Sequence, residues 1–147
     1  MKIDETTIAA VTGGASGLGA ATATALAERG AKVAILDMNK DLGTALAADL
    51  GGHFNAVDVT DPAQVGTALK NIRDRHGALH VLVNCAGIGT PAKTVAKGVP
   101  HDQALFAKVI GVNLLGSFNC ASQAAALMVS ADPVSYTHLT LPTIYSV

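Results

Sequence analysis

The glycines of residues 12–19, Thr-Gly-Gly-Ala-Ser-Gly-Leu-Gly, are the residues whose types and spacing point most directly to chemistry. They follow an apolar segment at residues 8–11 and precede an alanine-rich segment, which is the order strand, tight turn, helix. Glycine adopts positive φ and lets a ligand approach the backbone, and the free N–H groups of a following helix attract phosphate. We expect Gly13 to make the turn, Gly17 to allow the close approach and Gly19 to pack helix on strand. The segment therefore predicts a site for the phosphates of a dinucleotide.

An acidic residue follows the next predicted strand. Residues 31–36, Ala-Lys-Val-Ala-Ile-Leu, are apolar enough for a buried strand, and Asp37 ends it. A carboxylate about 20 residues beyond such glycines can accept both ribose hydroxyls of NAD. Aspartate is also a good helix N-cap, and the polar run 39–41 would suit the start of a helix. Both interpretations are open at this point, although the glycine run favours the ribose role.

These residues together resemble a known family. The pattern Thr-Gly-x-x-x-Gly-x-Gly is similar to the cofactor motif of the short-chain dehydrogenase/reductases and differs from the simpler Gly-x-Gly-x-x-Gly. The resemblance extends from about residue 7 to residue 128 and includes further motifs in the family's order. These are Asp58-Val59, then Asn84-Cys85-Ala86-Gly87 where the family usually has Asn-Asn-Ala-Gly, then Val112-Asn113-Leu114 followed by Gly116.

The resemblance implies a set of cofactor-binding residues. The glycine turn would hold the phosphates, and three later groups would hold the adenine ribose, the adenine and the nicotinamide ribose. In chain order the residues are Gly13, Ser16, Gly17, Leu18, Gly19, Asp37, Asp58, Val59, Asn84, Ala86 and Gly87. Residues 58–61 could equally be a strand end and a helix cap, and we interpret Cys85 as a packing residue.

The acidic group also bears on the choice between NAD and NADP. A 2′-phosphate needs a cationic partner and would be repelled by Asp37. Neither Met38 nor Ser16, at the two positions where a basic residue would be expected for NADP, carries a positive charge. We therefore expect NAD as the cofactor.

The resemblance implies acid–base catalysis beside the cofactor. In the family a tyrosine exchanges a proton with the substrate oxygen, a lysine one helical turn later lowers its pKa, a serine orients the carbonyl, and an asparagine extends the proton relay. Only the asparagine maps here, onto Asn113, which we expect to be partly buried; a solvent-facing helix residue is the alternative. Tyr136 has Thr140 where the lysine should stand, and Tyr145 has no partner. We assign no catalytic serine, tyrosine or lysine and expect the chain to be inactive alone.

The elements that must position these residues alternate along the chain. The predicted strands are 7–11, 32–36, 54–59 and 79–84, and the predicted helices are 17–29, 40–50, 62–75 and 102–128. Asp61 and Pro62 begin the third helix, and Gly30 and Gly77 end the first and third. Such alternation forms right-handed βαβ units. We predict an α/β fold, an incomplete Rossmann-type doubly wound parallel sheet of strand order 3-2-1-4 in a three-layer sandwich.

Two segments differ from this pattern. Residues 88–100 form a long polar loop after the fourth strand, which we expect on the substrate side of the site. Residues 131–147 have no helical period, are interrupted by prolines, and resemble translated sequencing-adapter read-through. We predict an NAD-binding domain at 1–130 and an irregular, non-native tail at 131–147, with a divergent genuine C-terminus as the alternative.

Composition excludes several classes of function. The net charge of −1 gives no sign of nucleic acid or an anionic membrane as a partner, and no apolar run approaches the roughly 20 residues of a membrane span. The N-terminus resembles neither a signal nor a transit peptide, and two cysteines fit a reducing compartment, so we expect a cytoplasmic protein. Gly77 breaks the helix between His76 and His80, so we expect no metal site.

Substrate and assembly follow only from the resemblance. Residues 86–94, His101, Phe106 and 111–119 resemble the 3-hydroxyacyl-CoA dehydrogenase subgroup (type 2), which implies hydride transfer between NAD and a secondary alcohol, with an acyl-CoA as the small-molecule substrate. The alternatives are a non-catalytic nucleotide-binding remnant and another reductase of the family, such as a 3-oxoacyl-carrier-protein reductase, which usually uses NADP. The helix at 102–128 resembles one that pairs subunits, so we expect a homo-oligomer for the complete protein. Strand 4 would leave an open edge that favours self-association.

Overall fold

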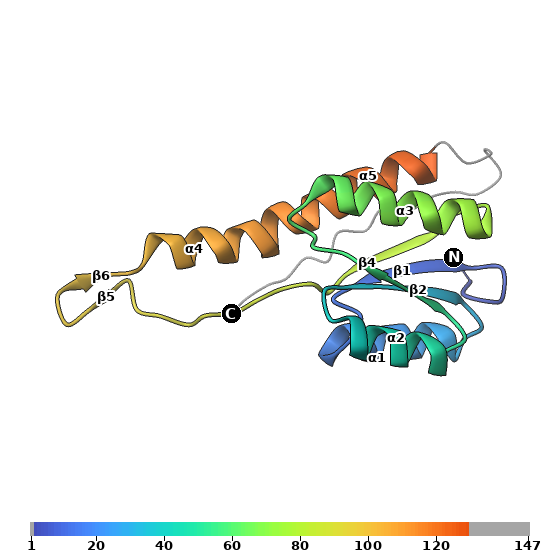
Figure 1. Ribbon diagram of the computed structural model, residues 1–147, viewed down its shortest axis with the longest axis horizontal. Helices are drawn as coiled ribbons and strands as arrows, with labels where there is room; N and C mark the ends of the chain where they lie inside the picture. The colour runs from blue at the N-terminus through green and yellow to red at the C-terminus, as the bar shows by residue number, and fades with distance from the viewer. Residues whose placement is uncertain (1, 130–147) are drawn as a thin grey trace.

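The computed structural model describes residues 2–129, which form a parallel sheet with helices on both faces (Figure 1). The strands are β1 (Ile8–Thr12), β2 (Lys32–Asp37), β3 (His53–Ala56) and β4 (Val81–Asn84). Their order is β3-β2-β1-β4 and every pairing is parallel, with Ala10 opposite Ala34 on one side and Leu82 on the other. The predicted fold class and strand order are confirmed.

Two layers of helix cover the sheet (Figure 1). Helices α1 (Gly17–Ala27) and α2 (Lys40–Asp49) lie on one face, and α3 (Pro62–His76) and α5 (Ser117–Val129) lie on the other. All five residues of β1 are buried because this central strand is covered on both faces. The result is the predicted three-layer sandwich.

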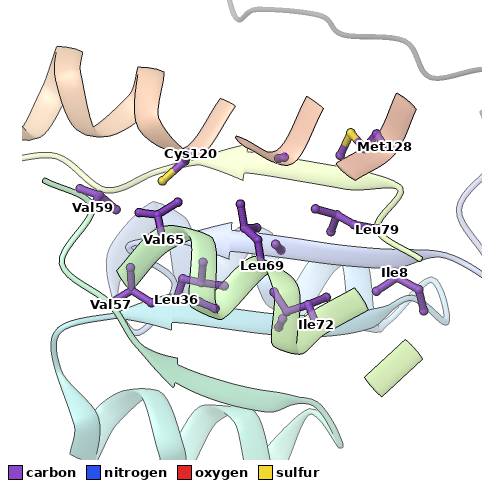
Figure 2. Packing of buried hydrophobic residues seen from close by; sticks show 14 residues of the cluster. Ile8, Leu36, Val57, Val59, Val65, Leu69, Ile72, Leu79, Cys120 and Met128 are labelled. Atoms are coloured by element: carbon purple, nitrogen blue, oxygen red, sulfur yellow. The ribbon is translucent and has the colours of Figure 1, made fainter. Parts of the chain in front are cut away.

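The core has one part on each face of the sheet. Between the sheet and helices α3 and α5, Val65, Leu69, Ile72, Cys120 and Met128 point toward one another (Figure 2). The opposite part is built from small residues of α1 and α2 against β1 and β2, so these helices approach the sheet closely. Burial of a side chain such as Leu69 contributes roughly 1.5–3 kcal/mol to folding.

Local signals set the ends of the helices. The carboxylate of Asp61 accepts hydrogen bonds from the N–H groups of Ala63 and Gln64 at the start of α3, and Gly77 ends that helix with φ of 82°. The side chain of Asn39 accepts from the N–H of Leu42 and so caps α2. The sequence leaves open whether Asp37, at the end of β2, binds a ribose or caps the next helix. Because Asn39 caps α2, Asp37 is not the helix cap.

The predicted helix at 102–128 is continuous but not uniform. It consists of α4 (Gln103–Ile110), a π-helical segment η1 (Gly111–Gly116) and α5. The periodicity of the apolar residues does not reveal the wider turn, which contains Asn113 and ends at Gly116. A Cβ on Gly116 would lie 2.6 Å from a methyl group of Val59, so this glycine lets the helix approach the loop after β3.

This helical segment differs from the expectation in a second way. Residues 103–129 form 27 residues of helix that, by length and composition alone, could cross a membrane, whereas the sequence analysis found no apolar run of that length. In the fold, however, α5 buries Cys120, Ala124 and Met128 against α3 and the sheet. We therefore interpret α5 as a layer of the domain.

The segment at 88–100, which we expected to be a long polar loop on the substrate side, is not without regular structure. It contains a short antiparallel hairpin, β5 (Val95–Ala96) and β6 (Val99–Pro100), that projects with α4 away from the sheet (Figure 1). Lys97 and Gly98 form its turn with φ of 51° and 78°. Positive φ at both central residues is the geometry of a type I′ turn. Lysine is unusual there, which is why the sequence did not indicate the hairpin.

The predicted strands 54–59 and 79–84 are also too long. The third strand ends at Ala56 because the chain turns at Asp58, whose carboxylate accepts hydrogen bonds from the N–H and hydroxyl groups of Thr60. The fourth begins only at Val81. Before it, the Nδ1 atom of His80 accepts a hydrogen bond from the N–H of Ile8, 3.0 Å away.

Candidate functional site

A cleft of about 800 Å³ lies at the carboxyl ends of the central strands. It is bounded by the glycine turn, the end of β2, the loop after β3, the end of β4 and the start of η1. Every predicted cofactor-binding residue except Asn84 lines this cleft, namely Gly13, Ser16, Gly17, Leu18, Gly19, Asp37, Asp58, Val59, Ala86 and Gly87.

The three glycines of the turn have different surroundings. Gly13 has φ of 61°, and a Cβ there would lie 2.7 Å from the backbone of Ala86. A Cβ on Gly19 would lie 2.0 Å from the carbonyl oxygen of Gly13, so this position holds the helix against the turn. Gly17 has φ of 53° with open space around it among the described residues. A ligand phosphate could therefore approach the backbone at Gly17.

The start of α1 is suited to an anion. The first helical hydrogen bond runs from the N–H of Ala20 to the carbonyl of Ser16, so the preceding N–H groups of the helix face the cleft without helical partners. Within residues 2–129 the Ser16 hydroxyl makes no capping bond to the helix. These N–H groups, the hydroxyl and the positive end of the helix dipole can bind phosphate together.

The carboxylate of Asp37 lies between the glycine turn and the cleft. Its Oδ2 atom accepts a hydrogen bond from the N–H of Ala15 at 3.0 Å, and its Oδ1 atom accepts from the N–H of Asn39 at 2.8 Å. Each carboxylate oxygen has a second lone pair that can accept a hydroxyl. Met38, the next residue, is exposed at the rim of the cleft and adds no charge.

The loop after β3 forms the wall at one end of the cleft. Asp58 is neither a strand end nor a helix cap, because the strand ends at Ala56 and the cap is Asp61. It instead bonds to Thr60 within the loop, through its Oδ1 atom at 2.9 Å from the N–H and 2.7 Å from the hydroxyl. Val59 is buried beneath the wall and packs on Gly116.

A buried hydroxyl holds the wall at the other end. The Oγ1 atom of Thr12 accepts hydrogen bonds from the N–H groups of Cys85 at 3.2 Å and Ala86 at 3.1 Å. Asn84 lies behind these residues, where its Nδ2 atom donates to the carbonyl of Ser117 at 3.4 Å. The structure thus places Asn84 in a supporting network and gives Thr12 a role that its position at the head of the glycine motif could have suggested.

Asn113 connects η1 to the segment that follows β4. Its Oδ1 atom accepts from the N–H of Ile88 at 2.8 Å, and its Nδ2 atom donates to the carbonyl of Ile88 at 2.9 Å. The residue is exposed, so the expectation of partial burial was wrong. Both polar atoms of its amide are thus bonded to one backbone unit, that of Ile88. A part in proton relay stays a prediction.

Several cleft residues were missed from the sequence. The main ones are Thr60, Lys108, Gly111 and Val112. Gly111 and Val112 follow Lys108 by three and four positions on one helical stretch, and residues at these spacings lie on the same side of a helix. That spacing was the signal that could have placed them beside the cleft.

His53, His76 and His80 lie at the amino ends of β3 and β4 and at the end of α3, opposite the cleft. The Nε2 atom of His76 and the Nδ1 atom of His53 are 3.4 Å apart. Burial, and then the neighbouring His76 and Arg75, lower the pKa of His53 to about 4. Within residues 2–129, three or more potential metal-ligating side chains do not come together.

A Rossmann-type sheet, a glycine turn at the start of α1 and an acidic residue at the end of β2 define a dinucleotide-binding protein. Comparison with known proteins makes this more specific. The sequence model of the short chain dehydrogenase family matches residues 7–134, and the chain belongs to this family of oxidoreductases.

Similar proteins agree with this assignment. The chain is 42% identical over 130 residues to 3-hydroxyacyl-CoA dehydrogenase type-2 of Drosophila melanogaster, which covers 86% of this chain and 51% of the fly protein. The human protein of the same name is also 42% identical, with 86% and 50% covered. Aldohexose dehydrogenase of Thermoplasma acidophilum superposes with a TM-score of 0.73 at 30% identity, covering 84% of this chain and 44% of that one. The chain spans about half the length of the curated relatives that it matches.

Proposed function

We propose that the cleft binds NAD and that the protein transfers a hydride between NAD and the alcohol carbon of a 3-hydroxyacyl-CoA. The observation that carries the cofactor assignment is the carboxylate of Asp37, held beside the glycine turn by the N–H of Ala15. A ribose with free hydroxyls can bond to this carboxylate, whereas a 2′-phosphate would be repelled by it. The neutral Met38 at the rim supports the same preference.

Each part of the cleft has a proposed role in holding the dinucleotide. The N–H groups at the start of α1 bind the pyrophosphate, and the loop at Asp58 and Val59 covers the adenine. Ala86 and Gly87 form the wall beside the nicotinamide ribose. When bound, NAD supplies the hydride chemistry, and the chain's residues fix its orientation. Asn113 keeps the segment after Gly87 in place through the backbone of Ile88.

The projecting segment at 88–101 supports an anionic substrate. It carries Lys93, Lys97 and His101 and no acidic residue. The phosphates of a coenzyme A thioester are attracted to such a segment, and the names of the fly and human relatives specify a 3-hydroxyacyl-CoA. This segment leaves the end of β4 and therefore begins beside the proposed nicotinamide position.

Proton transfer requires groups that we do not assign in this chain. Asn113 is the one residue proposed for the relay, and Tyr136 and Tyr145 lie outside the described residues. We propose that the chain supplies the nucleotide-binding half and that a serine and a Tyr-x-x-x-Lys pair belong to a following half. The chain is then inactive alone but binds NAD.

We also propose that the complete protein is a homo-oligomer. The helical segment from α4 to α5 exposes an outward apolar face, formed by Phe106, Leu114, Leu115, Phe118 and Val129. Exposed apolar patches of this kind mark interaction surfaces. The β4 strand is an outer strand of the sheet that the described residues form, which adds a second route to self-association.

Sequencing the source gene downstream of the codon for Ser130 tests the dehydrogenase assignment. The proposal expects the reading frame to continue through a serine and a Tyr-x-x-x-Lys pair. The longer product should then reduce NAD with 3-hydroxybutyryl-CoA, which is followed by NADH absorbance. A longer product that oxidises no 3-hydroxyacyl-CoA would contradict the substrate, and a frame that ends at Val147 would contradict the catalytic role.

A further inference from the structure

We propose that Asn119 and Gln123 of α5 are positioning residues that set the adenine wall of the cleft. The Nδ2 atom of Asn119 donates a hydrogen bond to the carbonyl of Val59 at 3.0 Å. The Nε2 atom of Gln123, one helical turn later, donates to the carbonyl of Pro62 at 2.9 Å. Two amides on one face of α5 therefore hold both ends of the loop at residues 59–62.

This loop needs support because the sheet does not hold it. The β3 strand ends at Ala56, and the last backbone bond to the sheet runs from the N–H of Val57 to the carbonyl of Asp37 at 3.0 Å. Beyond that point Asp58 bonds to Thr60 within the loop, and its N–H donates to the Oε1 atom of Gln64 at the start of α3, 3.1 Å away. The long-range hydrogen bonds to the loop's carbonyls, at Val59 and Pro62, come from α5.

The packing around the two amides fits this role. Gly116, the residue directly before α5, leaves room for Val59, since a Cβ there would lie 2.6 Å from a Val59 methyl group. Gly66 of α3 leaves room for Gln123, since a Cβ there would lie 2.6 Å from its Oε1 atom. The loop and the amide thus fit into two places where a side chain is missing.

The consequence is confined to one end of the cleft. Residues 57–60 line the cleft, whereas Asn119 and Gln123 do not touch it. Loss of either amide should therefore loosen the adenine wall and leave the wall at Ala86 and Gly87 intact. The inference rests on the proposed function, in which this end of the cleft holds adenine.

Uncharged replacements of similar size test the proposal. Asn119→Leu and Gln123→Met remove the donors without adding a negative charge that would repel a nucleotide. The matched control is Ser122→Ala, because the Ser122 hydroxyl bonds only to carbonyls of its own helix, at Phe118 and Asn119. Binding of AMP and of nicotinamide mononucleotide to the chain is measured by isothermal titration or ligand-observed NMR.

We expect each variant to weaken AMP binding about threefold and the double variant roughly tenfold, the effect of losing one and two neutral hydrogen bonds. Nicotinamide mononucleotide should bind as to the wild type, and Ser122→Ala should change neither ligand. Gly66→Ala should give the same AMP-specific loss by displacing Gln123, and since alanine favours helix, without a loss of helix stability.

Three results would overturn the proposal, and the last of them would overturn the proposed function as well. Variants that bind AMP like the wild type, or that lose both ligands equally, would show that α5 does not position the adenine wall. Wild-type chain that binds neither ligand would overturn the NAD assignment, and the inference with it.

Discussion

The hydroxyl of Thr12 accepts the hydrogen bonds that hold the nicotinamide side of the cleft. Thr12→Val removes this hydroxyl and keeps the shape of the side chain. Thr12 is 1% exposed, and its Oγ1 atom accepts from the N–H of Ala86 at 3.1 Å and of Cys85 at 3.2 Å. The Cys85 N–H keeps a second acceptor, the carbonyl of Thr12 at 3.2 Å. The hydroxyl also donates to the Oδ1 atom of Asn84, but at 3.5 Å this bond is long and contributes little. Thr12→Val therefore leaves one donor, the N–H of Ala86, without its acceptor.

The magnitude follows from that single orphaned donor. An unsatisfied donor of this kind costs about 1–3 kcal/mol, so we expect the free energy of unfolding to fall by about 2 kcal/mol. Thr12→Ser is the matched control, because it keeps the hydroxyl and loses only a methyl group, at about 0.8 kcal/mol. The valine variant should also weaken NADH binding, since Ala86 and Gly87 form the proposed ribose wall, whereas the serine variant should not.

Urea unfolding of the three proteins, together with amide hydrogen exchange at Ala86, measures this effect. A loss of about 2 kcal/mol moves the urea midpoint by roughly 1 M for a chain of this size. Exchange at Ala86 should be faster in Thr12→Val than in Thr12→Ser. A valine variant that is at least as stable as the serine variant and protects Ala86 equally would show that the Thr12 hydroxyl does not hold this segment.

Three further predictions concern cofactor choice, pH and assembly. Asp37→Ala should weaken NADH binding roughly tenfold and narrow the difference from NADPH, because it removes a charged acceptor; unchanged discrimination in a fluorescence titration would contradict this. The free energy of unfolding should fall by about 2 kcal/mol as the pH drops from 6.5 to about 4, because folded His53 resists a proton that the unfolded imidazole accepts; water at this half-buried site screens the effect below its full value. In His53→Gln the free energy of unfolding, measured with urea at each pH, should depend less on pH over this range. An unchanged pH dependence would show that another group causes the loss of stability in acid. Phe118→Glu, on the outward face of α5, should shift the chain toward monomer in sedimentation velocity, while Thr67→Glu, at an exposed position of α3 beside β3, should not; association that survives Phe118→Glu would move the interface to another surface.

The sequence was sufficient for the sheet and most of the cleft because those features depend on local patterns. Alternating apolar strands and helices indicate parallel βαβ units with right-handed crossovers, and the glycine motif indicates the Rossmann-type strand order. The glycine turn and Asp37 sit at the ends of β1 and β2, and parallel strands bring those ends to one edge. Asp61 caps the start of α3 and Gly77 ends it, as expected, because cap residues act within a few positions of the chain.

The features that could not be predicted depend on contacts between distant segments. The π-helical segment contains Asn113, whose side chain bonds to Ile88, a residue 25 positions away in the sequence. The place of Asn84 behind the cleft depends on its contact with Ser117. The bonds of Asn119 and Gln123 to the loop after β3 join residues about 60 positions apart, and no periodicity in the sequence encodes such a pair. The hairpin at 95–100 was missed for a local reason, since Lys97 occupies a turn position that usually holds asparagine, aspartate or glycine.

The proposed function depends first on selective binding of NAD in the cleft. Titration of the chain with NADH and with NADPH, followed by nicotinamide fluorescence, measures that selectivity. We expect NADH to bind at least about tenfold more tightly, because Asp37 accepts the free ribose hydroxyls and repels a 2′-phosphate. Equal affinities, or tighter binding of NADPH, would contradict it.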